Sequence, residues 1–319
     1  MPNSILSIDL LNWRNINLNS PQIKLISKRY SSNIYLDEKN EITWLLKAVS
    51  FCDMTTLMGD DSISNVRRLC HKSLKPLSLK TQSILKEKFD IHATNLIAAA
   101  VCIYPSQVSE VKSQLKGSEI NIASVATGFP SGQYPLHTRL QEIEYCISKG
   151  ATEIDVVINR SLVHQGNWEE LYNELVAMRH ACTVKLKTIL EVGQLGSYKN
   201  IYSASMVAML AGADFIKTST GKECSANATL PMSLVMLLAI SDFYRQTGIK
   251  VGFKPAGGIR TSDDALNLMK LVYNVLGENY LDKSLFRMGC SSLITSLEKR
   301  ILTLLTGNDF IHEMDMILS

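Results

Sequence analysis

The sequence predicts an α/β protein of the (β/α)₈ barrel class, a TIM barrel with an N-terminal extension. Eight short apolar runs rich in Val, Ile and Ala recur along the 319 residues, and a segment with helical periodicity follows each run. Strands that alternate strictly with helices form a parallel sheet, and eight such units closing on themselves make a barrel of ~250 residues. The chain is long enough for this barrel and an extension before it.

The expected strands are apolar runs bounded by polar or turn-forming residues. In chain order they are AVSFCDMTTL (48–57), NLIAAAVCIY (95–104), INIASVATGF (120–129), TEIDVVIN (152–159), TVKLKTILEV (183–192), ADFIKTS (213–219), KVGFKPAGG (250–258) and LFRMGCSS (285–292). A doubly wound open sheet is the alternative. It would normally carry a GxGxxG turn after the first strand, and CDMTTLMGDD has none.

The helices are expected between these strands, at 63–74, 105–116, 135–149, 167–180, 198–211, 228–247, 262–276 and 292–306. Thr261 and Ser262 supply a start signal for one of them, and Gly150, Gly212 and Gly248 follow the last turns of three others. Residues 1–45 look helical only in patches and are expected to pack on the outside or bottom of a barrel formed by 46–319.

Composition favours small-molecule chemistry. The net charge is only +3 and the basic residues are spread along the chain, which argues against nucleic-acid and membrane partners. The seven cysteines form no CxxC pair and indicate reduced thiols. The N-terminal residues lack the pattern of a leader, and no apolar stretch approaches the ~18 residues of a membrane helix, so a cytoplasmic protein is expected.

Charged residues interrupt the expected strands. If the apolar faces pack on the helices, the interior of the barrel receives the charged set Asp155, Lys187, Glu191, Lys217 and Lys254, with Asp53 as a candidate from the first strand. Buried charges cost several kcal/mol unless they are paired or functional. A purely structural ion-pair network would explain any one of them. Several together near the carboxyl ends of the strands favour an active site.

Two of these charges are amines at matching heights on neighbouring strands, Lys217 and Lys254. Two ammonium groups ~6 Å apart at an effective dielectric constant of ~20 repel by about 2 to 3 kcal/mol, which lowers the pKa of one by roughly two units. A neutral, desolvated amine is the nucleophile of Schiff-base catalysis. Asp155 and Lys187 can supply the proton transfers. The spacing does not decide which lysine is the nucleophile.

Small residues follow the sixth, seventh and eighth strands, in Gly221-Lys222, in residues 256–260 and in residues 289–292. Glycines let backbone N–H groups approach an anion, and the loops after strands seven and eight are the usual phosphate site of this barrel. The alternative is a set of tight turns. The candidate phosphate-binding residues are Gly221, Lys222, Gly257, Gly258, Arg260, Ser291 and Ser292.

Six segments together resemble the deoxyribose-phosphate aldolases: DFIKTSTGK, GFKPAGGIR, EIDVVIN, CDMTTL, AVCIYP and MGCSS. The resemblance runs from about residue 45 to residue 306, and the long extension is similar to that of animal-type members. It implies a class I carbon–carbon lyase that needs no cofactor or metal. Such an enzyme reversibly cleaves 2-deoxy-D-ribose 5-phosphate to D-glyceraldehyde 3-phosphate and acetaldehyde in deoxyribonucleoside catabolism.

The resemblance also implies roles for residues. Lys217 forms the Schiff base, Lys254 is the neighbouring amine that favours its neutral form, and Asp155 works in the proton relay through a water. Further residues that line or support the pocket are Cys102, Asp53, Thr218 and Lys187. Cys102 also fits the plainer interpretation of a small buried side chain. Bacterial members end in a tyrosine that helps to move a proton, whereas this chain ends HEMDMILS, with no tyrosine after Tyr280.

Two other functions fit the same pattern. One is a class I aldolase or transaldolase that acts on a different sugar phosphate. The other is a barrel that binds phosphate but serves as a scaffold, which the buried lysines disfavour because an inert protein gains nothing from buried charges. The expected partners are a sugar phosphate and an aldehyde, and a homo-oligomer is compatible with the sequence.

Overall fold

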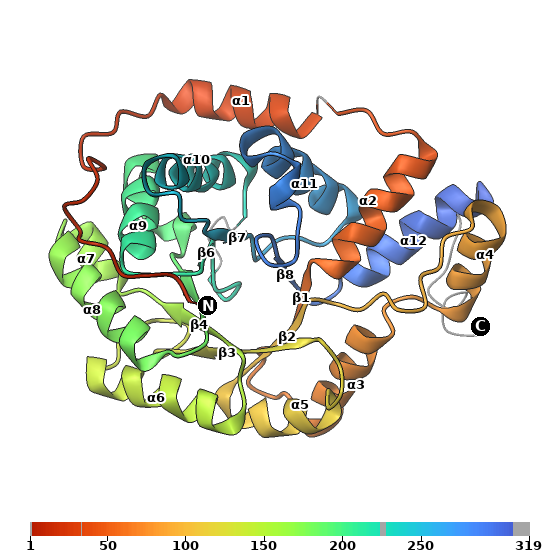
Figure 1. Ribbon diagram of the computed structural model, residues 1–319, viewed down its shortest axis with the longest axis horizontal. Coiled ribbons are helices and arrows are strands. Elements are labelled where there is room, and N and C mark those ends of the chain that lie inside the picture. Colours follow the sequence, from red (N-terminus) through yellow and green to blue (C-terminus); the bar gives the residue numbers. More distant parts are fainter. Residues whose placement is uncertain (1, 33, 224–227, 309–319) are drawn as a thin grey trace.

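The computed structural model describes residues 2–32, 34–223 and 228–308. Its core is a sheet of eight parallel strands surrounded by helices (Figure 1). The strands are β1 (Cys52–Thr55), β2 (Ala100–Ile103), β3 (Asn121–Ala126), β4 (Glu153–Val157), β5 (Lys185–Ile189), β6 (Phe215–Lys217), β7 (Gly252–Lys254) and β8 (Met288–Cys290). Each lies inside one of the eight apolar runs, so the predicted strand order is confirmed.

The sheet closes on itself. Strand β1 pairs with both β2 and β8. Between β7 and β8, isolated parallel bridges join Phe253 to Phe286 and Ala256 to Gly289. The N–H of Phe253 donates to the carbonyl of Leu285 at 2.8 Å. These contacts make a nearly closed barrel, which excludes the doubly wound open sheet.

Helices follow the strands as expected. They are α3 (Ile63–Leu74), α5 (Val108–Gln114), α6 (Leu136–Lys149), α8 (Trp168–Ala181), α9 (Tyr198–Leu210), α10 (Leu230–Thr247), α11 (Ser262–Leu276) and α12 (Leu293–Thr306). Their ends follow capping chemistry: Thr261 and Asp264 form a capping box at the start of α11, and Gly150 takes the left-handed conformation that ends α6. Two additional helices were not predicted, α4 (Leu79–Phe89) and α7 (Arg160–His164).

Two further helices lie before the barrel, α1 (Ser20–Ser32) and α2 (Glu38–Ser50). Helix α1 packs on α10 and α11, and α2 packs on α11 and α12, outside the ring (Figure 1). The sequence expectation of a strand from residue 48 was wrong at its start, because Ala48 and Val49 belong to the buried face of α2 and the strand begins at Cys52. A short apolar run fits either element. The predicted division between residues 45 and 46 falls inside α2 and stays a prediction.

The chain before α1 is tied to the barrel at the amino end of β6. The N–H of Asn3 donates to Asp214 Oδ1 at 2.8 Å, and the N–H of Leu6 donates to the carbonyl of Leu210 at 2.8 Å. Asp214 also pairs with the buried Arg179 at 2.9 Å. This arrangement leaves the opposite end of the barrel, where the strands end, open for a site.

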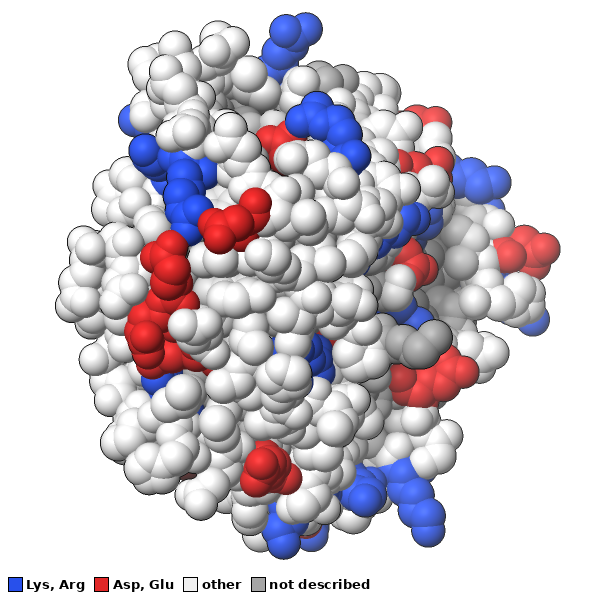
Figure 2. Space-filling model, turned by 60° about the vertical axis from the view of Figure 1, so that its left-hand side comes forward, with Lys and Arg blue, Asp and Glu red and all other residues white. Residues whose placement is uncertain are grey.

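The surface carries charges of both signs. On the face that Figure 2 shows, basic and acidic side chains lie interspersed among uncharged ones. In the described part of the chain, every helix is too short or too polar to cross a bilayer.

Candidate active site

Two lysines and one aspartate meet at the carboxyl ends of the strands. Lys217 on β6 lies in register with Lys254 on β7, as predicted. Both Nζ atoms donate to Oδ2 of Asp155 on β4, at 2.9 Å from Lys217 and 2.8 Å from Lys254. The three side chains are at most 3% exposed. One carboxylate oxygen therefore holds two amines in a dry environment.

Asp155 and Lys254 also belong to a larger network of ion pairs inside the barrel. Lys187 on β5 reaches Asp155 Oδ1 at 2.8 Å and Glu153 Oε2 at 2.7 Å. Lys254 reaches Asp53 Oδ2 on β1 at 2.6 Å. Arg287, just before β8, donates to Asp53 Oδ1 at 2.8 Å and to Glu153 Oε1 at 2.9 Å. We call this set the barrel network: Asp53, Glu153, Asp155, Lys187, Lys217, Lys254 and Arg287.

Neighbouring charges hold Asp155 and Lys254 in their ionised forms. Burial alone would raise the pKa of Asp155, but Lys187, Lys217 and Lys254 outweigh it and hold that pKa well below its usual range. Burial alone would lower the pKa of Lys254, but Asp155 and Asp53 outweigh it and hold that pKa well above its usual range. Lys254 is therefore the charged member of the amine pair. The other member, Lys217, is left as the candidate nucleophile.

An apolar wall faces the charged half of the barrel interior. It consists of Leu57, Ala100, Cys102, Ala123 and Val125, mostly from β2 and β3. Tyr104 and Phe129, which sequence reasoning missed, pack against this wall with their ring centroids 5.9 Å apart. The GFP run at 128–130 was the signal that could have found Phe129.

Cys102 is the member of the apolar wall that contacts the barrel network. Its Sγ is 3.9 Å from Asp155 Oδ2, and burial together with that carboxylate raises the pKa of the thiol. The thiol is therefore protonated at neutral pH, which fits a small packing side chain rather than a nucleophile.

The loops after β6, β7 and β8 come together as predicted. Thr218 links the first two, because its Oγ1 donates to the carbonyl of Ala256 and accepts from the N–H of the same residue, both at 2.9 Å. The N–H of Gly289, within β8, donates to the carbonyl of Pro255 at 2.9 Å and joins β8 to the start of the loop after β7. Gly257 and Gly258 have φ of +80° and +83°, a region that L side chains rarely adopt.

The N-terminus of α12 is open to an anion. Its cap residue Ser292 makes no side-chain capping bond, whereas Thr261 and Asp264 cap the neighbouring α11. Free N–H groups at a helix start attract negative charge. Ser291 and Ser292 line a hollow of about 670 Å³ that also takes in Arg68.

The remaining predicted phosphate residues lie around these loops. Gly221 has φ of +75°, and a Cβ there would lie 3.9 Å from the Cα of Gly257. Lys222 Nζ lies 3.4 Å from Met58 Sδ in the loop after β1. Arg260 is exposed at the start of α11, and its N–H donates to Asp264.

The sequence analysis assigned the wrong position to Glu191 and did not include Glu153 or Arg287 among the site residues. Glu191 was expected to point into the barrel, but β5 ends at Ile189 and Glu191 lies beyond it with φ of +55°. Its Oε2 accepts the N–H of Thr220 at 2.8 Å, so it braces the loop after β6. Glu153 and Arg287 were not singled out. The signal for Arg287 was a charge inside the apolar run LFRMGC.

The sequence pattern of the DeoC/LacD family aldolases matches residues 47–289, which run from before β1 into β8. The chain belongs to this family of aldolases. Among its relatives is the deoxyribose-phosphate aldolase of Homo sapiens, which is 48% identical over 301 residues, or 93% of each chain.

Two solved structures share the fold of this aldolase. A putative deoxyribose-phosphate aldolase from Toxoplasma gondii has a TM-score of 0.68 at 19% identity, with 86% of this chain and 98% of that chain covered. The tetrameric deoxyribose phosphate aldolase from Aeropyrum pernix has a TM-score of 0.56 at 22% identity, with 83% and 98% covered.

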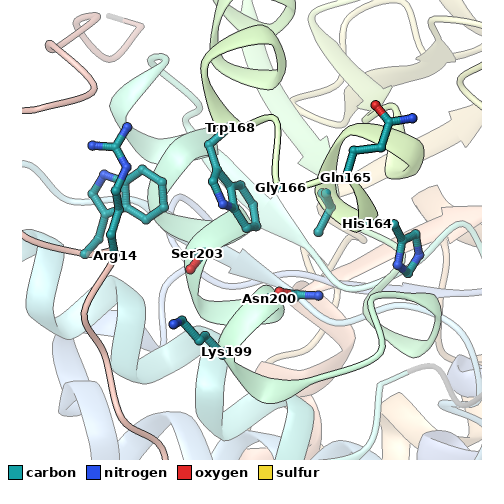
Figure 3. A pocket seen from close by; sticks show the side chains of 10 residues that line it. Arg14, His164, Gln165, Gly166, Trp168, Lys199, Asn200 and Ser203 are labelled. Atoms are coloured by element: carbon teal, nitrogen blue, oxygen red, sulfur yellow. The ribbon is translucent and has the colours of Figure 1, made fainter.

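The aldolase also has a hollow of about 460 Å³ away from the barrel network, lined by Trp13, Arg14, Trp168 and Lys199 among others (Figure 3). Its lining comes from the extension, from the end of α7 and the turn after it, and from the first turns of α8 and α9, and it includes none of the predicted site residues. Among the described residues, no group of three or more His, Cys, Asp or Glu side chains is arranged to hold a metal ion.

Proposed function

We propose that this aldolase reversibly cleaves 2-deoxy-D-ribose 5-phosphate to D-glyceraldehyde 3-phosphate and acetaldehyde. The observation that carries the proposal is the single oxygen of Asp155 that holds both Lys217 and Lys254. This geometry supplies an amine, a neighbouring cation and a carboxylate within one hydrogen-bonded group. The high identity to the human enzyme over nearly the whole chain supports the same substrate.

In the cleavage direction, the neutral amine of Lys217 attacks C1 of the open-chain sugar and forms a carbinolamine. Loss of water gives an iminium ion. The bond between C2 and C3 then breaks, its electron pair moves toward the iminium to form an enamine, and the C3 hydroxyl loses its proton. The enamine takes up a proton at C2, and hydrolysis of the resulting imine releases acetaldehyde and regenerates the lysine.

The surrounding side chains serve these proton transfers. Asp155 is the acidic partner of the relay through a water, and Lys254 supplies positive charge beside the reacting nitrogen. Cys102 and the rest of the apolar wall would contact the two-carbon fragment. Lys187 and Asp53 hold Asp155 and Lys254 in place through the contacts described above.

The phosphate group belongs in the loops after β6, β7 and β8. The residues that would hold it are Gly221, Lys222, Gly257, Gly258, Arg260, Ser291 and Ser292. The uncapped start of α12 and the positive φ of the glycines support this placement.

The setting of the enzyme is also part of the proposal. The six cysteines in the part of the chain that the structure describes are free thiols, which favours a reducing compartment, the cytoplasm, where deoxyribonucleosides are broken down. The tetramer described for the Aeropyrum pernix enzyme supports a homo-oligomer.

Borohydride trapping tests the mechanism. The protein is incubated with acetaldehyde and sodium borohydride, and its intact mass and modified peptide are measured. We expect a gain of one ethyl group on Lys217 that is absent from Lys217→Ala and present in Lys222→Ala, which serves as the matched control. Folded protein without an adduct would overturn the Schiff-base proposal, and an adduct on Lys254 would reverse the roles of the two amines.

Substrate profiling tests the specificity. Rates with 2-deoxy-D-ribose 5-phosphate are compared with rates for other sugar phosphates at equal concentration. Faster cleavage of a different sugar phosphate would keep the aldolase chemistry and change the substrate.

A further inference from the structure

Arg287 lies inside the barrel network and contacts neither lysine of the amine pair among the hydrogen bonds of the described residues. Its guanidinium bonds Asp53 Oδ1 at 2.8 Å and Glu153 Oε1 at 2.9 Å. Those two carboxylates use their other oxygens for lysines: Asp53 Oδ2 for Lys254 at 2.6 Å and Glu153 Oε2 for Lys187 at 2.7 Å. Arg287 therefore acts on the lysines through the carboxylates.

The barrel network has more cationic side chains than carboxylates. It contains three carboxylates and four cationic side chains, and all seven side chains are at most 3% exposed. With every group ionised, the barrel interior would carry one surplus positive charge. An uncompensated buried charge is costly, and the cost disappears when one cation gives up its proton.

The contacts indicate which cation gives up its proton. Arginine does not deprotonate in proteins. Lys187 contacts three carboxylates and Lys254 contacts two. Among the described residues, Lys217 forms an ion pair with Asp155 alone, through the oxygen that Lys254 also uses. The least compensated cation is therefore Lys217.

We infer that Arg287 is a positioning residue of the aldolase, whose fixed positive charge balances the barrel network so that Lys217 stands as a neutral, nucleophilic amine. The inference rests on the proposed Schiff-base function and deepens it. In this arrangement Glu153 has the opposite effect to Arg287, because each carboxylate in the network favours the protonated form of the lysines.

The charge environment of Lys217 includes groups from each strand that contributes to the network. The titratable and charged groups are Asp53 on β1, Cys102 on β2, Glu153 and Asp155 on β4, Lys187 on β5, Lys254 on β7 and Arg287 before β8. Only Arg287 carries a positive charge that pH cannot remove. Its substitution therefore changes the balance at every pH at which the enzyme works.

The test is the pH dependence of borohydride trapping with acetaldehyde in single-turnover experiments. Arg287→Met removes a positive charge, so we expect the pH midpoint for adduct formation to rise by about one unit, which is roughly the effect of a unit charge ~10 Å away at an effective dielectric constant of ~20. Glu153→Gln removes a negative charge and should lower the midpoint by a similar amount. The double variant should return toward the wild-type value.

Two controls separate charge balance from mere stability. Arg287→Lys keeps the positive charge and should leave the midpoint in place. Arg139→Met removes a different buried arginine, which pairs with Glu174 at 3.0 Å between α6 and α8 outside the barrel. It should lower stability without moving the midpoint.

Failure of the inference about Arg287 and failure of the proposed Schiff-base function give different results in these experiments. Wild-type trapping on Lys217, together with midpoints that do not move in Arg287→Met and Glu153→Gln, would overturn the inference and leave the aldolase mechanism intact. If Arg287→Met does not fold, Glu153→Gln decides alone, and an unchanged or raised midpoint in that variant contradicts the inference. Absence of trapping in the wild type would instead refute the proposed function.

Discussion

Lys217 and Lys254 lie in register on β6 and β7, and their nitrogens reach the same oxygen of Asp155. One carboxylate oxygen cannot fully compensate two ammonium groups, and in the proposed mechanism one of the two amines gives up its proton. Lys254 has a second carboxylate contact, with Asp53, that distinguishes it from Lys217. In the proposed mechanism, the register of the two strands thus provides one charged and one reactive amine.

The first prediction concerns the charged amine. Lys254→Met removes the positive charge nearest to Lys217, so we expect trapping with acetaldehyde to be about 100-fold slower at neutral pH and the pH midpoint to rise by roughly two units. Lys254→Arg keeps the charge and should retain more activity than Lys254→Met. Trapping rates between pH 6 and 10 check this, with circular dichroism to show that both variants fold. Equal losses in the two variants, without a change in midpoint, would contradict the charge argument.

The second prediction separates phosphate binding from the chemistry. Lys222→Ala should raise KM for 2-deoxy-D-ribose 5-phosphate by about tenfold or more, because a charge-assisted hydrogen bond to the phosphate is lost. The rate with unphosphorylated 2-deoxy-D-ribose should change little. Steady-state kinetics with both sugars measure the difference. A parallel loss with both sugars would place Lys222 in the chemical steps instead.

The strands and most helices were predictable from the sequence because each βα unit repeats the same pattern of apolar run, turn and amphipathic helix. Alternation along a strand predicted that Asp155, Lys187, Lys217 and Lys254 face the interior, and the pairing of β6 with β7 places the lysines as expected. Strand pairing in a barrel follows chain order, so adjacency in sequence became adjacency in space.

The rest of the site required the structure. The start of β1 was misjudged because α2 continues through an apolar run that reads equally well as a strand. The role proposed for Arg287 depends on the pairing of β1 with β8, which brings Arg287 to Asp53, 234 positions earlier in the chain. No local sequence pattern reports such a contact. Glu191 left its predicted face because the chain turns with φ of +55° directly after β5.

The third prediction concerns Glu191. Glu191 is fully buried and accepts the N–H of Thr220 at 2.8 Å, in the loop between Lys217 and Lys222. Glu191→Ala leaves this N–H without its partner and should lower the free energy of unfolding by about 1 to 3 kcal/mol. Glu191→Gln keeps an acceptor and should lose less. Chemical denaturation measures the free energies. If Glu191→Ala is as stable as the wild type, the loop does not depend on this bond.

The fourth prediction follows from the carboxylates of the barrel network. In Asp53, burial raises the pKa but Lys254, Arg287 and Lys187 outweigh it, and Glu153 and Asp155 likewise have lowered pKa values in the folded protein. In the unfolded chain their pKa values return to about 4. A lowered folded pKa contributes stability that is fully present above the unfolded value and is lost as the pH falls toward the folded value.

We therefore expect the contribution of these groups to the free energy of unfolding to be constant from pH 7 to about 5 and to fall steeply below about pH 4. Glu153→Gln lacks one of the three carboxylates, so its free energy of unfolding should fall less over the acid range, although the variant starts lower. The free energies of unfolding of both proteins are measured by guanidinium chloride denaturation at pH 7, 5, 4 and 3.5. The two proteins are compared at the same ionic strength at each pH. Equal acid slopes for the two proteins would mean that the stability lost in acid comes from carboxylates outside the barrel.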